Sequence, residues 1–495
     1  MSRLVVRSGG PLRGRVRVPG DKSIAQRAVL LGALAEGEGR ITGFPPSGDC
    51  LATVACVRGL GVELGVLTLT PAPLPGRERG EPTLTPGPSP SQGEGRSLTP
   101  GSSLWEGEGG GVVLVVRGRG LGGLRAPVGP LDCVRSGTTM RLLAGVLAGQ
   151  PFESILTGDP QLLRRPMGRV VEPLRRMGAE IEMVDGHAPL LVHGRPLRGC
   201  DHVLPVASAQ VKSALLLAGL WAAGPTTVRQ PGPARDHTER MLAAMGAGVE
   251  VAGLAVTLNP SRSLLPLSLC IPGDVSSAAF PLVAAALVPG SQVTVERVGV
   301  NPTRTGLLEV LRAMGAGVAV DGEREYPHPY RPAVGPLFLG GRGEEWREPV
   351  ADVTVRASHL QGVEVGGERV VRMIDEFPVL AVAATQACGT TVVRDAAELR
   401  VKESDRIATA VAELRALGAR IEPLPDGFVV EGPTPLHGGV VESHGDHRLA
   451  MALAVAGLVA QGEVVIENAD CIADSFPGFV ESMRSVGAVV STRNT

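Results

Sequence analysis

Hydrophobic residues along this chain fall into segments of two kinds, which alternate. Six segments are apolar on nearly every side, which is typical of helices that lie buried in a core. They cover residues 23–35, 137–148, 208–223, 276–287, 375–388 and 446–460. A short run that favours a strand follows each of them, for example Thr391-Val392-Val393. The pattern therefore predicts an α/β protein in which buried helices and strands alternate.

A second set of helices is amphipathic, and each ends in the same phrase: an apolar residue, a glycine, and then Ala or Val. The glycines of this phrase are Gly61, Gly178, Gly246, Gly315, Gly418 and Gly487. Each glycine is expected to form the C-cap of its helix, and a strand-like run follows it. Successive glycines lie 117, 68, 69, 103 and 69 residues apart. Three spacings near 68 indicate a repeated unit of strand, buried helix, strand, amphipathic helix and strand hairpin, with six copies in two domains of three.

Two insertions explain the longer spacings. Residues 65–111 are rich in Pro, Gly, Ser and Thr, which is typical of low-complexity sequence. Residues 322–349 contain both tyrosines of the chain. Each insertion follows the strand after a glycine cap and precedes another strand, so we expect both to lengthen the same hairpin turn in two copies of the unit. Surface turns tolerate such insertions because a longer loop adds little closure entropy.

Composition and charge narrow the class of protein. The chain is 43% hydrophobic and carries a net charge of −2 without a long run of like charges, so we expect no nucleic-acid partner. Its longest apolar run, residues 449–460, is too short to span a bilayer, and the first residues lack a signal-peptide pattern. Seven scattered cysteines without CxxC spacing indicate reduced thiols. We therefore expect a cytoplasmic protein without a membrane partner.

Lysine is rare, and its positions suggest chemistry. Among 48 Lys and Arg residues, only Lys22, Lys212 and Lys402 are lysines. An ammonium gives up a proton more readily than a guanidinium, although a coding bias alone would also leave a few lysines. Lys22 follows Pro19-Gly20 at the start of the first buried helix, which either Asp21 or Ser23 can cap. A cation beside the positive end of a helix dipole is favourable when an anion lies between them.

Other helix starts also carry polar and charged residues, which either cap the helices or line a site. If the buried helices lie parallel, their starts converge on one interdomain cleft. Its predicted cations are Lys22, Arg27, Arg165, Arg235, Lys402, Arg406 and Arg448, and its carboxylates are Asp375 and Glu403. Such a cleft suits two anionic substrates and an acid–base step. No cluster has metal-ligand spacing and no Walker loop occurs, so we expect neither a metal nor a cofactor.

Taken together, the motifs at these helix starts resemble the EPSP synthases of the enolpyruvyl transferase family. The motifs are residues 19–27, 136–138, 156–158, 165–166, 208–210, 400–406 and 446–448, in order through nearly the whole chain outside the insertions. The resemblance implies two domains, each of three βαβαββ units, in a six-fold repeat known as an inside-out α/β barrel. It also implies crossings near Gly20 and Gly273, with domain I formed by residues 1–20 and 273–495 and domain II by residues 21–272.

The resemblance further implies the reaction and the site. The 5-hydroxyl of shikimate 3-phosphate would add to C2 of phosphoenolpyruvate, and the tetrahedral adduct would then lose phosphate, in a monomer without a cofactor. Shikimate 3-phosphate would be held by Lys22, Ser23, Arg27, Ser208, Ala209, Gln210, Arg235, Asp375 and Lys402. Phosphoenolpyruvate would be held by Lys22, Gly137, Arg165, Gln210, Arg406 and Arg448. Asp375 would accept the hydroxyl proton, and Lys22 and Glu403 would take part in the other proton transfers.

Three positions depart from the family pattern. Arg135 stands where the family usually has Asn, Ala234 replaces a common Ser beside Arg235, and Asp474 stands where some members have Lys, so we assign it no ligand role. Lys212 also has no implied ligand role. In the family the herbicide glyphosate occupies the phosphoenolpyruvate site, and Gly137 leaves this site roomy, so we expect sensitivity.

Two rival functions remain. The sibling carboxyvinyl transferase acting on UDP-N-acetylglucosamine usually has Asn after its first Lys and a reactive Cys before its Arg-Pro. Here Ser23 follows Lys22, and residues 158–166 contain no Cys. The second rival is a repeat scaffold that binds neither substrate.

Overall fold

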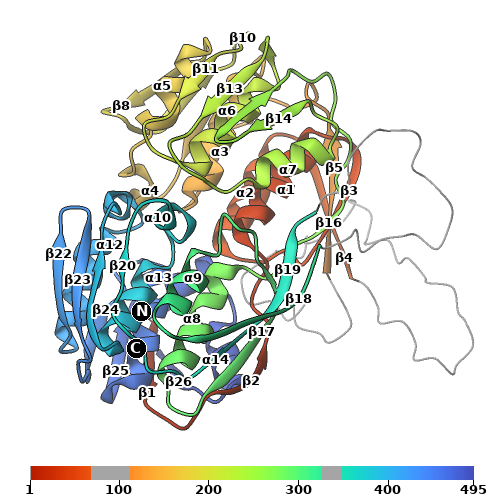
Figure 1. Cartoon of the computed structure of the whole chain (residues 1–495). Coiled ribbons are helices and arrows are strands. Elements are labelled where there is room, and N and C mark those ends of the chain that lie inside the picture. Colours follow the sequence, from red (N-terminus) through yellow and green to blue (C-terminus); the bar gives the residue numbers. More distant parts are fainter. Residues whose placement is uncertain (1, 69–111, 326–346, 495) are drawn as a thin grey trace, which may run out of the picture.

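The computed structural model describes residues 2–68, 112–325 and 347–494, and these residues form two domains, one above the other in Figure 1. Each domain has its own hydrophobic core. One core draws on residues 24–271, and we call its domain, the upper one in Figure 1, domain II. The other core combines residues 4–16 with residues 275–490, and we call its domain domain I. The predicted class, two domains of mixed α/β units, is confirmed.

Three four-stranded sheets form the described part of domain II, and in each sheet a parallel pair of strands continues into an antiparallel hairpin. The strand orders are β16 (Leu269–Cys270), β3 (Glu36–Thr42), β5 (Val112–Arg119), β4 (Glu63–Thr68); β6 (Leu131–Asp132), β7 (Glu153–Thr157), β9 (His187–His193), β8 (Glu180–Val184); and β11 (Asp201–Val203), β13 (Thr226–Arg229), β15 (Ala255–Leu258), β14 (Val249–Ala252). Two short strands, β10 (Leu197–Arg198) and β12 (Ala222–Ala223), form a separate parallel sheet in the same domain.

Domain I repeats this arrangement in the residues described. Its strand orders are β2 (Arg13–Val16), β17 (Gln292–Gly299), β19 (Pro349–Arg356), β18 (Gly317–Glu325); β20 (Glu364–Val365), β21 (Gly389–Val393), β23 (Gly427–Gly432), β22 (Arg420–Leu424); and β24 (His437–Glu442), β25 (Gln461–Glu467), β1 (Ser2–Arg7), β26 (Val489–Asn494). The first two strands of each sheet are parallel and the others antiparallel. All six four-stranded sheets share one pattern of strand directions, but in the sheet of β24, β25, β1 and β26 the start of the chain supplies β1 in place of the last hairpin strand.

Two strands belong to a different domain from the helix that follows them in sequence. β2 comes just before the first buried helix of domain II, yet it pairs with β17 in domain I. β16 comes just before the first buried helix of domain I, yet it pairs with β3 in domain II. The chain thus crosses between the domains directly after each of these strands. The linear order of strand and helix within a unit does not hold for the first and fourth units.

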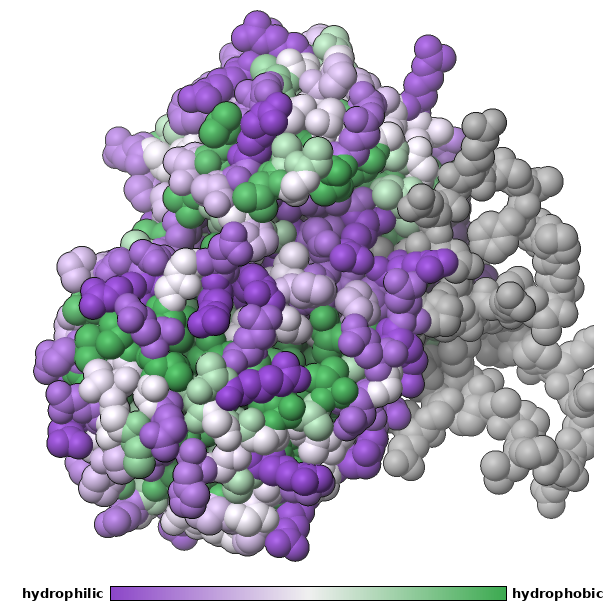
Figure 2. Space-filling model, in the orientation of Figure 1, coloured by the Kyte–Doolittle hydropathy of each residue, from purple (hydrophilic) through white to green (hydrophobic). Residues whose placement is uncertain are grey.

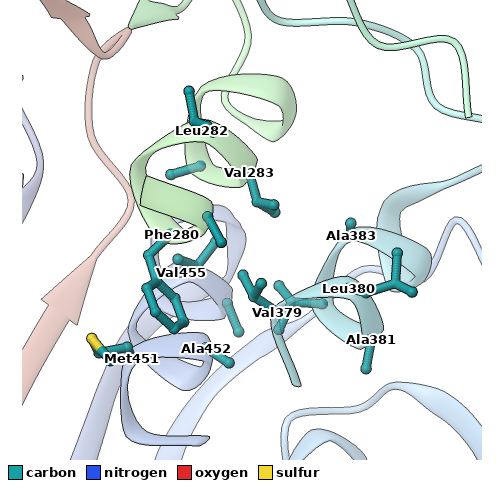
Figure 3. Close-up of a cluster of buried hydrophobic side chains, with 14 of the residues drawn as sticks. Phe280, Leu282, Val283, Val379, Leu380, Ala381, Ala383, Met451, Ala452 and Val455 are labelled. Carbon is teal, nitrogen blue, oxygen red and sulfur yellow. The ribbon is translucent and has the colours of Figure 1, made fainter. Parts of the chain in front are cut away.

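Buried helices form the centre of each domain at nearly the predicted positions. They are α1 (Lys22–Leu34), α3 (Gly137–Ala148) and α6 (Ala209–Gly219) in domain II, and α8 (Val275–Leu287), α11 (Phe377–Gln386) and α13 (His447–Val459) in domain I. The helix predicted to end at residue 223 ends at Gly219, because β12 forms a strand pair instead. Figure 3 shows Phe280 of α8, Val379 of α11 and Val455 of α13 meeting in one core.

The amphipathic helices end as their glycines predict. These helices are α2 (Gly48–Gly59), α5 (Gly168–Arg176), α7 (His237–Ala244), α9 (Gly306–Ala313), α12 (Arg406–Ala416) and α14 (Phe479–Ser485). All six cap glycines have a positive φ, between 84° and 101°, a conformation that L side chains disfavour. Short helices complete the described elements: α4 (Pro160–Leu163), α10 (Glu368–Arg372), η2 (Ala397–Val401) and η3 (Ala469–Asp474).

Both predicted insertions lie between strands that pair as hairpins. Thr68 of β4 is opposite Val112 of β5, and Glu325 of β18 is opposite Pro349 of β19. The strands β4 and β18 run a few residues past the predicted insertion starts at residues 65 and 322. The segments between them, and with them the low-complexity prediction, lie outside the described residues.

Hydrophilic residues gather where the two domains meet on the face shown in Figure 2. None of the helices in the described part of the chain has an apolar stretch of the length that a membrane crossing requires.

Candidate active site

Nearly all the predicted site residues line a cleft between the two domains. Domain II contributes the starts of α1, α3 and α6, and domain I contributes the segments before α11 and α12. The predicted residues that line the cleft are Lys22, Ser23, Arg27, Gly137, Arg165, Ser208, Ala209, Gln210, Arg235, Asp375, Lys402 and Glu403. The other two, Arg406 and Arg448, are buried behind its wall and are not among the lining residues.

N-caps hold the helix starts of domain II in the cleft. Asp21 caps α1, because its Oδ1 accepts a hydrogen bond from the Ile24 amide at 2.9 Å. Ser136 and Ser208 cap α3 and α6 in the same way. Since Asp21 is the cap, the hydroxyl of Ser23 faces the cleft, where it accepts a hydrogen bond from Arg235 Nη1 at 2.8 Å. The starts of these helices direct amide dipoles and hydroxyls towards the position of a bound anion.

Lys22 is held as a cation by a neighbour that sequence reasoning missed. Its Nζ lies 2.8 Å from Asp49 Oδ2, and the Lys22 side chain is only 17% exposed. Burial opposes the charge, but the Asp49 carboxylate outweighs it, so the pKa of Lys22 is raised above its ordinary value. Lys22 therefore enters any reaction here in its protonated form.

Asp375 is a carboxylate that cations from both domains approach. Its Oδ2 lies 2.5 Å from Arg235 Nη2 of domain II, and its Oδ1 lies 3.1 Å from Arg406 Nη1 of domain I. Burial favours the neutral acid, but Arg235, Lys402 and Arg406 together hold the pKa of Asp375 well below its usual range. In the adjacent Glu376, burial and the Asp375 charge raise the pKa. The pKa values of the two neighbouring carboxyl groups are thus shifted in opposite directions, and Asp375 is the one that stays ionised.

Glu403 is the second carboxylate of the cleft. Its two oxygens accept hydrogen bonds from Arg165 Nη1 at 3.1 Å and from Arg406 Nη2 at 2.8 Å. Burial acts against the charge, but these two arginines hold the pKa of Glu403 well below its usual range. Lys402 lies beside it, and burial lowers the pKa of Lys402 to about 8 despite the nearby Asp375. Lys402 is therefore a cation that deprotonates within an ordinary assay range.

Arg406 contacts both carboxylates of the cleft, whereas the ion pair of Arg448 is with Asp274. Arg406 bonds to Asp375, Glu403 and Asp446, the last at 2.8 Å through Nε. It thereby fixes both carboxylates of the cleft with one guanidinium. Arg448 is 2% exposed, and its Nε and Nη1 have no hydrogen-bond partner among the described residues. Its Nη2 lies 3.6 Å from Asp274 Oδ2.

Sequence reasoning also missed Arg141, although it lies near the start of the predicted helix 137–148. Arg141 is buried and donates to Gln210 Oε1 at 2.7 Å, while Gln210 Nε2 donates to Thr138 Oγ1 at 2.9 Å. These contacts fix which end of the Gln210 amide faces the cleft. Burial, with Arg165 nearby, lowers the pKa of Arg141 well below its usual value.

Lys212, the third lysine, has a structural position. Its Nζ lies 2.5 Å from Glu239 Oε1 in a buried ion pair, and it donates to the Ala234 carbonyl at 3.2 Å. It therefore holds the turn that carries Arg235. Among the described residues, no group of three or more His, Cys, Asp or Glu side chains has an arrangement that could bind a metal ion.

Comparisons with known proteins agree on one family. A family model described as EPSP synthase (3-phosphoshikimate 1-carboxyvinyltransferase) matches residues 6–69 and 104–483. The chain is 48% identical over 490 residues to the 3-phosphoshikimate 1-carboxyvinyltransferase of Acidithiobacillus ferrooxidans, with 99% of each chain covered. It is 50% identical to the protein of the same name from Pelotomaculum thermopropionicum, with 96% of each chain covered.

Solved structures also include an EPSP synthase with a similar fold. An EPSP synthase from Acinetobacter baumannii is 38% identical and superposes with a TM-score of 0.77, with 100% of both chains covered. The enolpyruvyl transferase NikO from Streptomyces tendae is 19% identical, with a TM-score of 0.72 and coverage of 100% of this chain and 99% of that one. The likeness to NikO concerns the fold alone.

Proposed function

This chain belongs to the EPSP synthase family, and from that premise we propose that it transfers the enolpyruvyl group of phosphoenolpyruvate to the 5-hydroxyl of shikimate 3-phosphate, releasing phosphate. The observation that carries the proposal is a single cleft with two ionised carboxylates, Asp375 and Glu403, opposite a protonated Lys22. A base and an acid in these protonation states are what an addition across a polar double bond needs.

In the first step of the proposed reaction, the substrate hydroxyl oxygen bonds to C2 of phosphoenolpyruvate while C3 gains a proton. Asp375 accepts the hydroxyl proton, because it is the carboxylate that Arg235 and Arg406 keep ionised. Lys22 donates towards C3, with Glu403 as its partner in the proton transfers. In the second step C3 loses a proton and the bond from C2 to the phosphate oxygen breaks, which gives the enolpyruvyl ether and inorganic phosphate.

The basic residues of the cleft would bind the two anionic substrates. We assign Lys22, Ser23, Arg27, Ser208, Ala209, Gln210, Arg235, Asp375 and Lys402 to shikimate 3-phosphate, and Lys22, Gly137, Arg165, Gln210, Arg406 and Arg448 to phosphoenolpyruvate. Arg27 supports this division, since Thr238 and Ser213 hold its guanidinium at 2.8 and 3.0 Å, beside Ser23. Arg406 bonds to both cleft carboxylates, so we expect it to act first by orienting them.

The proposal includes the domain limits, with domain I as residues 1–20 and 273–495 and domain II as residues 21–272. The division of the two cores at these points supports it. It also includes a cytoplasmic monomer. All seven cysteines are free thiols, which suits a reducing compartment, and every site residue named above comes from one chain.

A phosphate-release assay tests the proposed activity. We expect release only when phosphoenolpyruvate and shikimate 3-phosphate are both present. Asp375→Asn should lower kcat by about 100-fold or more, because it removes the proton acceptor. Asp395→Asn is the matched control, since Asp395 also lines the cleft but, within the described part of the chain, its side chain accepts only from the Gly367 amide at 2.9 Å.

Two results would contradict the proposal. Phosphate release with UDP-N-acetylglucosamine in place of shikimate 3-phosphate would favour the sibling transferase. A calorimetric titration without heat for either proposed substrate would favour a non-catalytic scaffold.

A further inference from the structure

The two crossings between the domains lie against each other. Gly20 and Gly273 form an antiparallel bridge, the Asp21 amide donates to the Pro272 carbonyl, and the Asp274 amide donates to the Pro19 carbonyl, both at 2.8 Å. Gly20 packs so tightly that an added Cβ would lie 2.1 Å from the Gly43 carbonyl oxygen. The connection between the domains is therefore a short, closely packed ribbon with a proline in each crossing.

One guanidinium joins the two crossings. Arg304, in the segment between β17 and α9, is 4% exposed. Its Nη1 donates to Asp21 Oδ2 at 2.7 Å, and its Nη2 donates to Asp274 Oδ1 at 2.9 Å and to Ser276 Oγ at 2.8 Å. Both aspartates are themselves buried. A planar guanidinium can span two carboxylates in this way, whereas an ammonium acts as a single point charge.

Both aspartates are N-caps of buried helices, and the helices belong to different domains. Asp21 Oδ1 accepts from Ile24 at the start of α1, and Asp274 Oδ1 accepts from the Ser276 amide at the start of α8. Lys22 and Ser23 follow Asp21 directly, and Arg448 Nη2 lies 3.6 Å from Asp274 Oδ2. Arg304 thus contacts Asp21, which precedes Lys22 and Ser23 in domain II, and Asp274, which pairs with Arg448 in domain I. Arg304 itself does not line the cleft.

We propose that Arg304 is a positioning residue, which sets the place of Lys22 and Ser23 relative to the carboxylates of domain I by holding the two crossings together. This inference rests on the proposed function for its kinetic readout. Acid–base groups supplied by two domains react only when their geometry is kept, and a displacement of about 1 Å can cost about 100-fold in rate. A residue that merely stabilised the fold would change the amount of folded protein but not the kcat of the folded fraction.

The test compares Arg304→Lys with Arg372→Lys. Arg372 is a matched control, because it also anchors the segment before α9, through the Pro302 carbonyl at 2.7 Å and through Glu309, but all these partners lie in domain I. We expect kcat for phosphate release to fall at least tenfold in Arg304→Lys, with each KM changed less than threefold. In Arg372→Lys we expect kcat within threefold of wild type. Equal losses in the two variants, or no loss in either, would overturn the proposal.

Removing the arginine alone takes the ion-pair partner from the buried Asp21 and leaves the buried Asp274 with Arg448 at 3.6 Å, which can prevent folding. The triple variant Arg304→Met, Asp21→Asn, Asp274→Asn removes all three charges and keeps two side chains that can cap helices. We expect it to fold, with kcat still at least tenfold below wild type. Recovery of kcat to within threefold of wild type would show that only charge balance mattered and would overturn the proposal.

Hydrogen exchange gives a readout that does not need substrates. In Arg304→Lys the amides of Asp21 and Asp274 should exchange at least tenfold faster, while core amides of α3 and α13 change less than twofold. Unchanged exchange at the two crossing amides would overturn the proposal. If the wild-type protein releases no phosphate, the proposed function fails, and the exchange experiment still decides the role of Arg304 in holding the crossings.

Discussion

Arg135 and Asp474 form an ion pair between the two domains, with Arg135 Nη1 3.2 Å from Asp474 Oδ2. Arg135 precedes α3 in domain II, and Asp474 ends η3 in domain I. These are two of the three positions at which the sequence departs from the family pattern. The two departures therefore form one interaction, because the guanidinium of Arg135 pairs with the carboxylate of Asp474. Arg135 is also held by Asp159 within its own domain, at 2.8 Å.

The charge on Asp474 should make stability depend on pH. Burial, with Asp49 nearby, raises the pKa of Asp474 to about 6 in spite of Arg135. The folded protein then holds a proton that the unfolded chain has released, so stability falls as pH rises from about 4 to about 6. Above about pH 6 the full effect is reached, and the raised pKa of Asp474 lowers the free energy of unfolding by about 2–3 kcal/mol. Asp474→Asn should recover it: we expect a gain of about 2 kcal/mol in the free energy of unfolding at pH 8 and about half of that at pH 5.

Urea unfolding at the two pH values measures this effect. Asp159→Asn is the control, because it removes the other carboxylate partner of Arg135 and keeps a residue that can cap α4. We expect no gain from it at pH 8. If Asp474→Asn destabilises the protein at pH 8, the ion pair with Arg135 outweighs the burial of the Asp474 carboxylate, contrary to this prediction.

Local patterns predicted most of the fold, because each of them has a local physical cause. The cap glycines, such as Gly178 and Gly487, all have the left-handed conformation that ended the predicted helices. The exchange of β2 and β16 between domains has no local signal. Each is a strand of two to four residues, and nothing within so short a run distinguishes pairing with one sheet from pairing with another.

The sequence predicts which helix starts surround the site, but it does not predict the directions of the side chains there. Lys22 lines the cleft as expected, since a helix start fixes where its first residues lie, and Arg165 lines it from the segment between α4 and α5. Arg406 and Arg448 also lie at helix starts, yet they point behind the cleft wall, and only the packing of α11, α12 and α13 decides this. Asp49 was missed because it lies in an amphipathic helix and its contact with Lys22, 27 residues away in sequence, has no local signal.

Lys402→Ala should mainly raise the KM for shikimate 3-phosphate. Loss of a charge-assisted contact costs about 1.5–3 kcal/mol, which corresponds to roughly 10- to 150-fold in KM at pH 7. Because the pKa of Lys402 is about 8, the wild-type KM should also rise above pH 8, as the ammonium loses its proton. Steady-state kinetics at pH 7 and pH 9 would measure both effects.

Lys402→Arg supplies the control for this titration. A guanidinium stays charged at pH 9, so the rise in KM between pH 7 and pH 9 should disappear in this variant. An unchanged KM in Lys402→Ala at pH 7 would count against the assignment of Lys402 to this substrate.

Gly137→Ala should weaken binding at the proposed phosphoenolpyruvate site. An added Cβ would lie 2.7 Å from Arg165 Nη1 and 2.8 Å from Arg141 Nη1, so both guanidinium groups would have to move. Since such overpacking costs about 1–3 kcal/mol, we expect KM for phosphoenolpyruvate to rise on the order of tenfold. Glyphosate, which we expect to inhibit the wild type in competition with phosphoenolpyruvate, should weaken in parallel.

Inhibition curves and steady-state kinetics would check these effects together. Gly122→Ala is the control, because an added Cβ there meets no atom within 4 Å. If Gly137→Ala leaves both the KM and the inhibition unchanged, the two arginines do not define that site.

Deleting residues 69–109 should leave kcat and both KM values within threefold of wild type. Thr68 and Val112 are opposite each other in the antiparallel pair of β4 and β5, so the deletion leaves Gly110-Gly111 as a two-residue turn between them. Gly-Gly suits such a turn, since it can take up the positive φ angles that a tight hairpin requires. The deleted segment joins strand ends that do not line the cleft. Soluble yield, the thermal unfolding midpoint and phosphate-release kinetics would test this, and loss of soluble protein would show that residues 69–109 contribute to the fold rather than lengthen a turn.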